Sequence, residues 1–215
     1  MSVSLNQILE MPNAAIIAQQ IQSALIQEQE KRRRFYEIVE DDKKMEFING
    51  EIYFQSPAKL RHTNAVGLLL ILLKSFVTRH DRGFVGSEKM LVSLTRNDYE
   101  PDICFFEKSK SREFKPDQMQ FPAPDIVVEV LSPSTEKHDR ETKFQDYAAH
   151  GIAEYWIIDA EHETIEQYML QNENYDLLLK AKEGSIQSMV LPEFRIQIRS
   201  VFDEQANLDE LKRLI

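Results

Sequence analysis

Two acidic residues stand where an unpaired carboxylate would be costly. Glu129 interrupts the apolar run from Asp125 to Leu131, and Asp102 precedes a second apolar run, Ile103–Phe106. A buried carboxylate without a partner is strongly unfavourable or becomes protonated, so each residue requires a cation, a basic side chain or a hydrogen-bond network. If the two runs form neighbouring strands, Asp102 and Glu129 can share a divalent metal ion such as Mg²⁺ or Mn²⁺. Such an ion lowers the pKa of a bound water and offsets charge on a phosphodiester.

A lysine follows Glu129 on the next expected element. Residues 135–149 read as a helix, on which Asp139, Lys143 and Tyr147 are one turn apart and share a face. Two interpretations stay open. Lys143 either forms only a surface ion pair with Asp139, which contributes little to stability, or it places a positive charge near the attacking water.

The composition fits one soluble globular domain with an appendage. The 215 residues are 42% hydrophobic and 29% charged, which excludes a disordered chain. The net charge is −10, from 26 basic and 36 acidic residues, and this argues against a protein that coats nucleic acid nonspecifically. It leaves room for a nuclease, because a metal site needs clustered carboxylates.

Cysteine content and hydropathy indicate the cellular setting. The single cysteine, Cys104, excludes an internal disulfide framework. The longest apolar run, Val66–Leu73, amounts to about two helical turns and is too short to cross a bilayer. The N-terminus lacks a basic-then-apolar signal pattern. We therefore expect a cytoplasmic protein with no membrane segment.

Residues 1–34 read as an N-terminal helical extension. A helix is expected from Ala14 to about Arg34, and its apolar residues form one stripe. Such a stripe needs a partner surface, so the helix should pack outside the core or against a second subunit, which leaves a homodimer open. The helix ends in the basic run Lys31–Arg34, which is either a solvated helix end or a patch that contacts DNA.

Residues 35–215 alternate between strand and helix patterns, which indicates an α/β fold. Asn49-Gly50 between two short β-prone runs predicts a hairpin over residues 45–54. The other expected elements are, in order, a helix over 58–79; strands over 84–94, 103–106 and 126–131; the helix over 135–149; a strand over 154–159; a hairpin over 164–181; one or two strands within 186–202; and a helix over 204–214.

Several short sequence fragments are specific only when they are taken together. They are Glu46–Glu51, His62, Pro101-Asp102, Pro124–Thr135, Asp139, Lys143, Tyr147, Gly151 and Glu154–Asp159. Together they resemble the Uma2 family of putative restriction endonucleases, which is assigned to the PD-(D/E)XK nuclease superfamily. The resemblance covers roughly residues 35–190. It implies a restriction-endonuclease-like core, a mixed β-sheet flanked by helices, with a metal-dependent phosphodiesterase site and DNA as the substrate.

The resemblance also implies roles for two residues outside the apolar strands. His62 would face the site and touch a phosphate or a water; the alternative is a structural histidine satisfied by a backbone group. Glu46 would be a further metal ligand or a partner of the lysine; the alternative is a strand residue that faces solvent.

One position departs from the superfamily pattern. The catalytic lysine normally lies two residues after the acidic residue, and here that position is Leu131. The resemblance implies that the lysine role moves to the following helix, at Lys143. We then expect Lys143→Ala to abolish most cleavage while leaving the fold and metal binding nearly intact. Without this relocation, the chain is a catalytically inactive nuclease-fold protein that binds nucleic acid or a protein partner.

Two further features have alternative interpretations. The basic segment Lys108–Lys115 between the carboxylate strands either contacts a DNA backbone or is merely solvated. Trp156 is most simply a core residue. A third class of function is a structural oligomer held together by the N-terminal helix.

Overall fold

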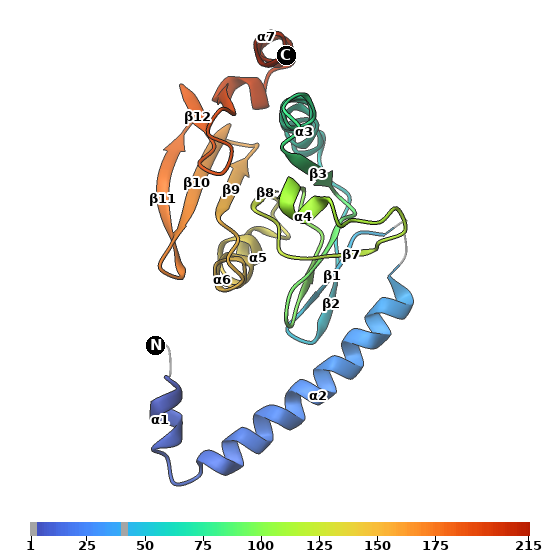
Figure 1. Cartoon of the computed structure of the whole chain (residues 1–215), viewed down its shortest axis with the longest axis vertical. Helices are drawn as coiled ribbons and strands as arrows, with labels where there is room; N and C mark the ends of the chain where they lie inside the picture. The colour runs from blue at the N-terminus through green and yellow to red at the C-terminus, as the bar shows by residue number, and fades with distance from the viewer. Residues whose placement is uncertain (1–3, 40–42) are drawn as a thin grey trace.

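The computed structural model describes residues 4–39 and 43–215, and its centre is a six-stranded sheet (Figure 1). Its strands are β3 (Gly83–Ser87), β6 (Ile103–Glu107), β8 (Ile126–Val130), β9 (Glu154–Asp159), β10 (Thr164–Gln171) and β11 (Asn174–Ala181). The order across the sheet is β11-β10-β9-β8-β6-β3. The pair β8–β9 is parallel and the other neighbours are antiparallel, so the predicted mixed sheet is confirmed.

A second sheet carries the predicted hairpin. Its strands are β1 (Met45–Ile48), β2 (Glu51–Phe54), β4 (Leu91–Ser93), β5 (Asp98–Tyr99) and β7 (Gln120–Phe121), in the order β2-β1-β5-β4-β7. Asn49 and Gly50 join β1 to β2 with φ angles of 51° and 84°. Both lie in the left-handed region that a tight hairpin turn requires. β12 (Ser185–Gln187) and β13 (Arg195–Gln197) form a small separate ribbon.

Helices lie on both faces of the six-stranded sheet (Figure 1). They are α3 (Leu60–Arg79) and α7 (Glu204–Leu214) on one face, and α5 (Glu136–Arg140) and α6 (Thr142–Ala149) on the other. A 3₁₀ helix, Ile198–Val201, leads into α7. One apolar core fills the space under α3, and a second lies between the two sheets and α6. This is the predicted α/β class, with helices flanking a mixed sheet.

The long helix α3 has the length and hydropathy of a membrane-spanning segment, with a mean hydropathy of 1.3. This differs from the expectation drawn from Val66–Leu73 alone, because the mean hydropathy is taken over a longer stretch of the helix. The helix nevertheless supplies residues of the first core, among them Leu69 and Leu72, which are fully buried. These buried residues make α3 a core helix of the protein.

The N-terminal residues form α1 (Leu5–Leu9) and α2 (Ala14–Ile38), and α2 is longer than predicted. Its C-terminal half packs on the body: Phe35 is fully buried, and the Arg32 guanidinium lies 2.6 Å from the Asp98 carboxylate. Arg32 is therefore neither a solvated helix end nor a DNA contact. The N-terminal half stands away from the body (Figure 1). The domain boundary at residue 34 and the homodimer stay predictions.

Two expected elements are broken. The strand predicted over 84–94 divides into β3 and β4, which belong to different sheets, because Glu88 adopts a left-handed φ of 59°. The helix predicted over 135–149 divides into α5 and α6 at Glu141. The short elements α1, β5, β7 and α4 (Lys108–Ser111) carry no periodic signal and were not predicted.

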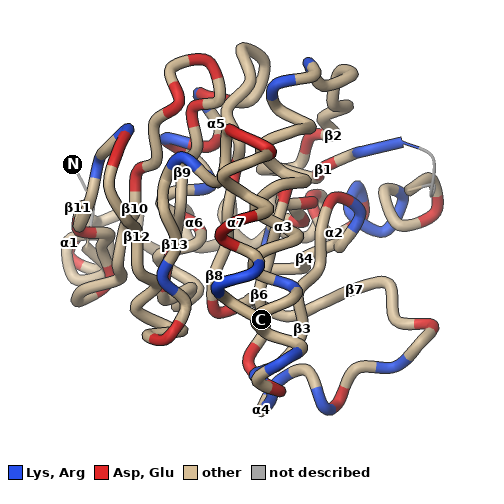
Figure 2. Tube along the Cα trace, turned by 90° about the horizontal axis from the view of Figure 1, so that it is seen from above, with Lys and Arg blue, Asp and Glu red and all other residues tan. Residues whose placement is uncertain are grey.

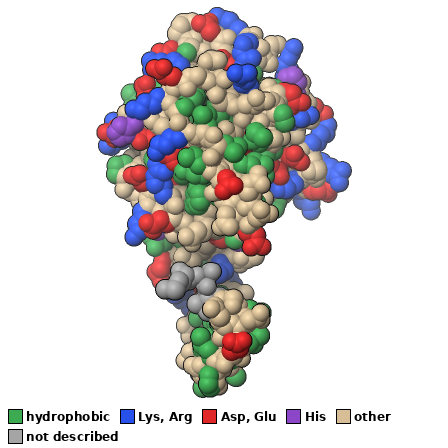
Figure 3. Space-filling model, turned by 90° about the vertical axis from the view of Figure 1, so that its left-hand side faces the viewer, with side chains coloured by type: hydrophobic (Ala, Val, Ile, Leu, Met, Phe, Trp, Pro, Cys, Tyr) green, Lys and Arg blue, Asp and Glu red, His purple; other side chains and the backbone are tan. Residues whose placement is uncertain are grey.

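The molecular surface mixes charge with apolar groups. Figure 2 shows acidic and basic residues interspersed along the trace. In the predicted basic segment, Lys108 pairs with Asp81 and Lys110 lies 2.8 Å from the Asp125 carboxylate, so these two cations are partly neutralised. Figure 3 shows hydrophobic side chains gathered in the middle of the face seen from the β11 side.

Candidate functional site

A cleft of about 920 Å³ opens beside the β1–β2 hairpin and the start of α3. Four of the five predicted site residues line it, namely Asp102, Glu129, Lys143 and His62. The fifth, Glu46, reaches the site through its contact with Lys143. The cleft lies at the end of β8, where the loop Leu131–Thr135 leads into α5 and forms one wall.

Asp102 and Glu129 come from neighbouring strands. β6 and β8 pair in antiparallel fashion with Ile103 opposite Val128. Asp102 immediately precedes Ile103, and Glu129 immediately follows Val128. The Asp102 carboxylate accepts a hydrogen bond from the Val130 backbone N–H, and Asp102 and Glu129 both line the cleft. The prediction that the two apolar runs are adjacent strands is therefore confirmed.

Asp102 is a buried carboxylate with both oxygens engaged. Its Oδ1 lies 2.6 Å from the Lys44 Nζ and 3.5 Å from the His62 Nε2, and its Oδ2 accepts a hydrogen bond from the Val130 backbone N–H at 2.8 Å. Burial alone would raise the pKa of Asp102, but the contacts with His62 and Lys44 outweigh it and hold that pKa below its usual value. Asp102 therefore stays ionised.

Glu129 lies in a different electrostatic environment. Its Oε1 accepts hydrogen bonds from the Lys143 Nζ at 3.0 Å and the Tyr147 hydroxyl at 2.9 Å. Burial raises the pKa of Glu129 to about 8; Lys143 opposes this shift, and the negative charge of Asp139 adds to it. The neighbouring side chains therefore supply too little positive charge to neutralise the ionised form of Glu129.

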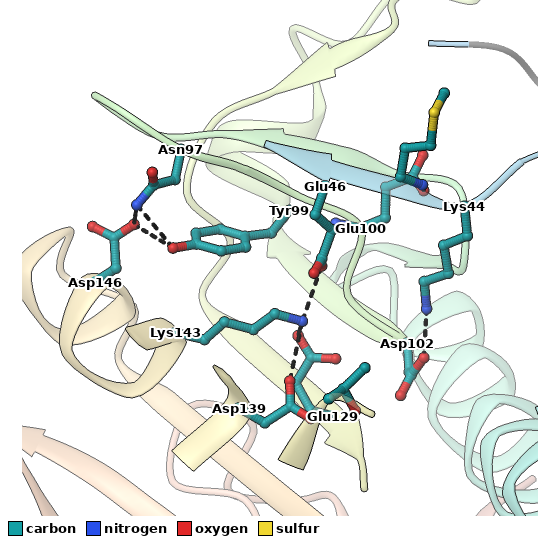
Figure 4. A network of polar contacts seen from close by, with 12 residues as sticks. Lys44, Glu46, Asn97, Tyr99, Glu100, Asp102, Glu129, Asp139, Lys143 and Asp146 are labelled. Carbon is teal, nitrogen blue, oxygen red and sulfur yellow. Dashed lines mark hydrogen bonds and ion pairs between the residues drawn. The ribbon is translucent and has the colours of Figure 1, made fainter. Parts of the chain in front are cut away.

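Lys143 occupies the middle of a carboxylate cluster (Figure 4). Its Nζ lies 2.9 Å from Glu46, 3.0 Å from Glu129 and 3.1 Å from Asp139, and its side chain is 1% exposed. Burial would lower the pKa of Lys143, but these carboxylates raise it well above the usual value. The surface ion pair considered for this residue is therefore wrong, because Lys143 is a buried counter-ion.

Two residues that the sequence did not single out complete the site. Lys44 precedes β1 and ion-pairs with Asp102. Glu88 projects from the break between β3 and β4, and ligand atoms of Glu88, His62 and Asp102 lie within 4.8 Å of one another. In the sequence both residues look like ordinary solvated charges. Their placement depends on the left-handed turn at Glu88 and on the packing of two sheets, which no local pattern reveals.

The donor set fits a divalent cation. Carboxylate oxygens dominate it, as hard cations such as Mg²⁺ and Mn²⁺ prefer, and the imidazole of His62 adds one nitrogen. The Nδ1 atom of that imidazole is buried without a hydrogen-bond partner among the described residues. His62, Glu88 and Asp102 are therefore the residues whose ligand atoms converge enough to hold an ion. Glu129, the predicted second ligand, lines the same cleft but is not part of this group among the described residues.

Trp156 and Glu154 belong to the interior instead. The Trp156 ring is 2% exposed and belongs to the first core, as predicted. Its indole N–H donates to the Glu154 carboxylate at 2.6 Å. Glu154 is also buried, but it lies outside the residues that line the cleft.

Known proteins resemble this chain in sequence and in fold. The chain is 28% identical over 151 residues to the uncharacterized protein slr1290 of Synechocystis sp.. The aligned region covers 66% of this chain and 74% of that protein. The crystal structure of a putative nuclease belonging to DUF820 from Anabaena variabilis matches with a TM-score of 0.68 at 20% identity, over 78% of this chain and 94% of that one. This likeness shows a shared fold.

The sequence also matches a family model. Residues 26–199 match Uma2, which is described as "Putative restriction endonuclease". The matched range includes every residue of the candidate site, from Lys44 to Lys143, and most of the chain. This chain therefore belongs to the Uma2 family.

Proposed function

We propose that this chain is a divalent-metal-dependent endonuclease that hydrolyses DNA phosphodiester bonds. The observation that carries the proposal is that Asp102 and Glu129, from the neighbouring β6 and β8 segments, line one cleft. His62 and Glu88 lie beside Asp102 and enlarge the set of ligand atoms. The family description supports the same reaction class.

Each residue contributes separately to this reaction. A bound divalent ion would supply a water of lowered pKa and would offset charge on the phosphate. Asp102 and Glu129 would hold that ion, with Glu88 and His62 as additional ligands. Lys143 orients Glu129 by an ion pair and Tyr147 does so by a hydrogen bond. Glu46 in turn positions Lys143.

The cleft carries cations of the kind that contact a nucleic-acid backbone, together with a larger number of acidic residues. Besides the carboxylates, it is lined by the basic side chains of Lys43, Lys44, Lys59 and Arg61. Such cations contact phosphates and supply the sequence-independent part of DNA affinity. A local basic rim is compatible with the overall charge of −10, because the two act over different distances.

A second candidate function rests on the lysine. Leu131 occupies the superfamily lysine position, and the charge of Lys143 is shared among three buried carboxylates. A lysine held in this way stabilises ligands rather than an attacking water. The alternative is therefore a nuclease-fold protein that binds nucleic acid without cutting it.

The test is cleavage of supercoiled plasmid and of end-labelled DNA and RNA oligonucleotides with Mg²⁺, with Mn²⁺ and with EDTA. We expect metal-dependent DNA cleavage that Asp102→Asn lowers about 100-fold or more, the scale for losing one preorganised electrostatic group. The matched control is Glu107→Gln, at the other end of β6, which should cut at the wild-type rate. DNA binding without cleavage under either metal would favour the second candidate.

A further inference from the structure

We propose that Lys44 competes with the divalent ion for Asp102, so that ion binding releases the Lys44 ammonium into the cleft, where the substrate phosphate would lie. The inference rests on the proposed function, because it concerns the same metal site. It assigns to Lys44 a role in coupling metal binding to the exposure of a positive charge.

The oxygens of Asp102 carry the first step. Oδ2 is committed to the Val130 backbone N–H, which fixes the carboxylate against β8. Oδ1 is the oxygen that faces the basic side chains: the Lys44 Nζ lies 2.6 Å from it and the His62 Nε2 lies 3.5 Å from it. A divalent ion would need to approach an oxygen to about 2.1 Å, which brings two positive charges close together.

The Lys44 ammonium lies in the place where an ion would bind. The Lys44 Nζ also lies 3.5 Å from the Glu88 Oε2, so it sits between two of the three residues whose ligand atoms cluster. An ion bound by Asp102 and Glu88 would take much the same place. The lysine and the ion therefore cannot both make their best contacts.

The Lys44 side chain can move away from Asp102. Its backbone is held, because its carbonyl accepts a hydrogen bond from the Gln55 N–H at 3.0 Å. Its side chain is 16% exposed and borders the cleft, so the long aliphatic stem can swing the ammonium toward water. Lys143 has no such route, since its side chain is 1% exposed and contacts three carboxylates.

The released ammonium supplies a charge that the sequence lacks at Leu131. An ammonium displaced from Asp102 has lost its counter-ion and lies in a cleft that also carries Lys43, Lys59 and Arg61, with which it can bind a phosphate. Metal loading thus prepares the cleft for substrate. By thermodynamic linkage, a substrate that binds the released ammonium strengthens metal binding by the factor by which the metal strengthens substrate binding.

The first test measures Mn²⁺ affinity of the full chain by isothermal titration calorimetry without DNA. Lys44→Met should bind Mn²⁺ about 10-fold more tightly than wild type, the scale of one charge-assisted hydrogen bond. Lys59→Met removes an equal charge from another cleft-lining residue and should change the affinity less than about 3-fold. Equal or weaker binding by Lys44→Met would overturn the competition.

The second test needs no variant. Amine-reactive labelling of the wild-type protein, read by mass spectrometry, should modify Lys44 more readily with Mn²⁺ than with EDTA, while Lys59 reacts equally in both. Increased protection of Lys44 by Mn²⁺ would overturn the inference. If neither wild type nor Lys44→Met binds Mn²⁺, the proposed metal-dependent function fails together with it; if wild type binds and the variant gains nothing, only the role of Lys44 fails.

Discussion

Two buried glutamates on adjacent parallel strands have opposite electrostatic surroundings. Glu129 on β8 and Glu154 on β9 are 3% and 0% exposed. Glu154 accepts five hydrogen bonds, from Trp156 Nε1, Gln167 Nε2, Ser188 Oγ and the backbone N–H groups of Met189 and Val190. Glu129 accepts two, and its neighbours include further carboxylates.

The difference separates a structural carboxylate from a candidate ligand. Neutral dipoles surround Glu154 and join β9 to the segment that precedes Leu191, so its charge is satisfied where it stands. Glu129 lines the cleft and shares Lys143 with two other acids, Glu46 and Asp139. Burial of a carboxylate therefore marks a site only when its negative charge exceeds what the protein neutralises.

Removal of Lys143 should disturb the Glu129 region most. Lys143→Ala leaves Glu46, Glu129 and Asp139 buried without their common counter-ion, so the free energy of unfolding should fall by about 3–5 kcal/mol. Urea denaturation in EDTA measures it, with the exposed Lys74→Ala as control. This replaces the expectation that the variant keeps its fold. A loss under about 1 kcal/mol would restore that expectation.

Replacing Glu154 and Glu129 with the isosteric glutamine should have opposite effects on stability and on Mn²⁺ affinity. Glu154→Gln places an amide N–H₂ group among five donors and should cost about 2–3 kcal/mol of stability while leaving Mn²⁺ affinity unchanged. Glu129→Gln should abolish most Mn²⁺ affinity without a stability loss. Equal destabilisation by both substitutions, in matched urea and calorimetric titrations, would remove the distinction.

The pH dependence of the same two variants sharpens the contrast. The pKa of Glu129 is raised from 4.5 to about 8, so between these values the folded protein binds more protons than the unfolded chain. Stability in EDTA should therefore fall as the pH rises through this window, and Glu129→Gln should remove that part of the slope. A thermal-denaturation series whose Tm difference between variant and wild type does not grow with pH would contradict this.

Single hydroxyl deletions should give the smallest effects. Ser188→Ala removes one donor from Glu154 and should cost about 1 kcal/mol in urea denaturation, with Mn²⁺ affinity intact. Tyr147→Phe removes a hydrogen bond that favours ionised Glu129, so Mn²⁺ affinity should fall about 3-fold to 10-fold. If Tyr147→Phe changed only stability, Tyr147 would be a packing residue and nothing more.

Local signals predicted what local interactions determine. The hairpin at Asn49-Gly50, the strand Glu154–Asp159 and the long helix α3 follow from turn chemistry and hydrophobic periodicity. Asp102 and Glu129 stood out because a charge in an apolar strand needs a partner. Glu154, which opens an equally apolar strand, drew no such notice, since four of its five donors come from other segments of the chain.

The remainder depends on tertiary structure. Residues 84–94 read as one β-prone run, and only the junction of two sheets explains why the chain turns at Glu88. The same turn brings Glu88 beside Asp102, so the missed break and the missed residue share one cause. The face of Lys143 could be predicted from helical spacing, whereas its burial could not.

The N-terminal half of α2 and the cleft are two surfaces that respond differently to ionic strength. Residues 14–27 of this helix contain no charged side chain, and Ile16, Ile21 and Ile26 are exposed. Association through such a surface is insensitive to screening and is strengthened by sulfate. Phosphate contacts at the basic cleft wall weaken steeply as salt rises. One salt titration therefore distinguishes a contact made by the N-terminal helix from one made by the cleft, without any mutation.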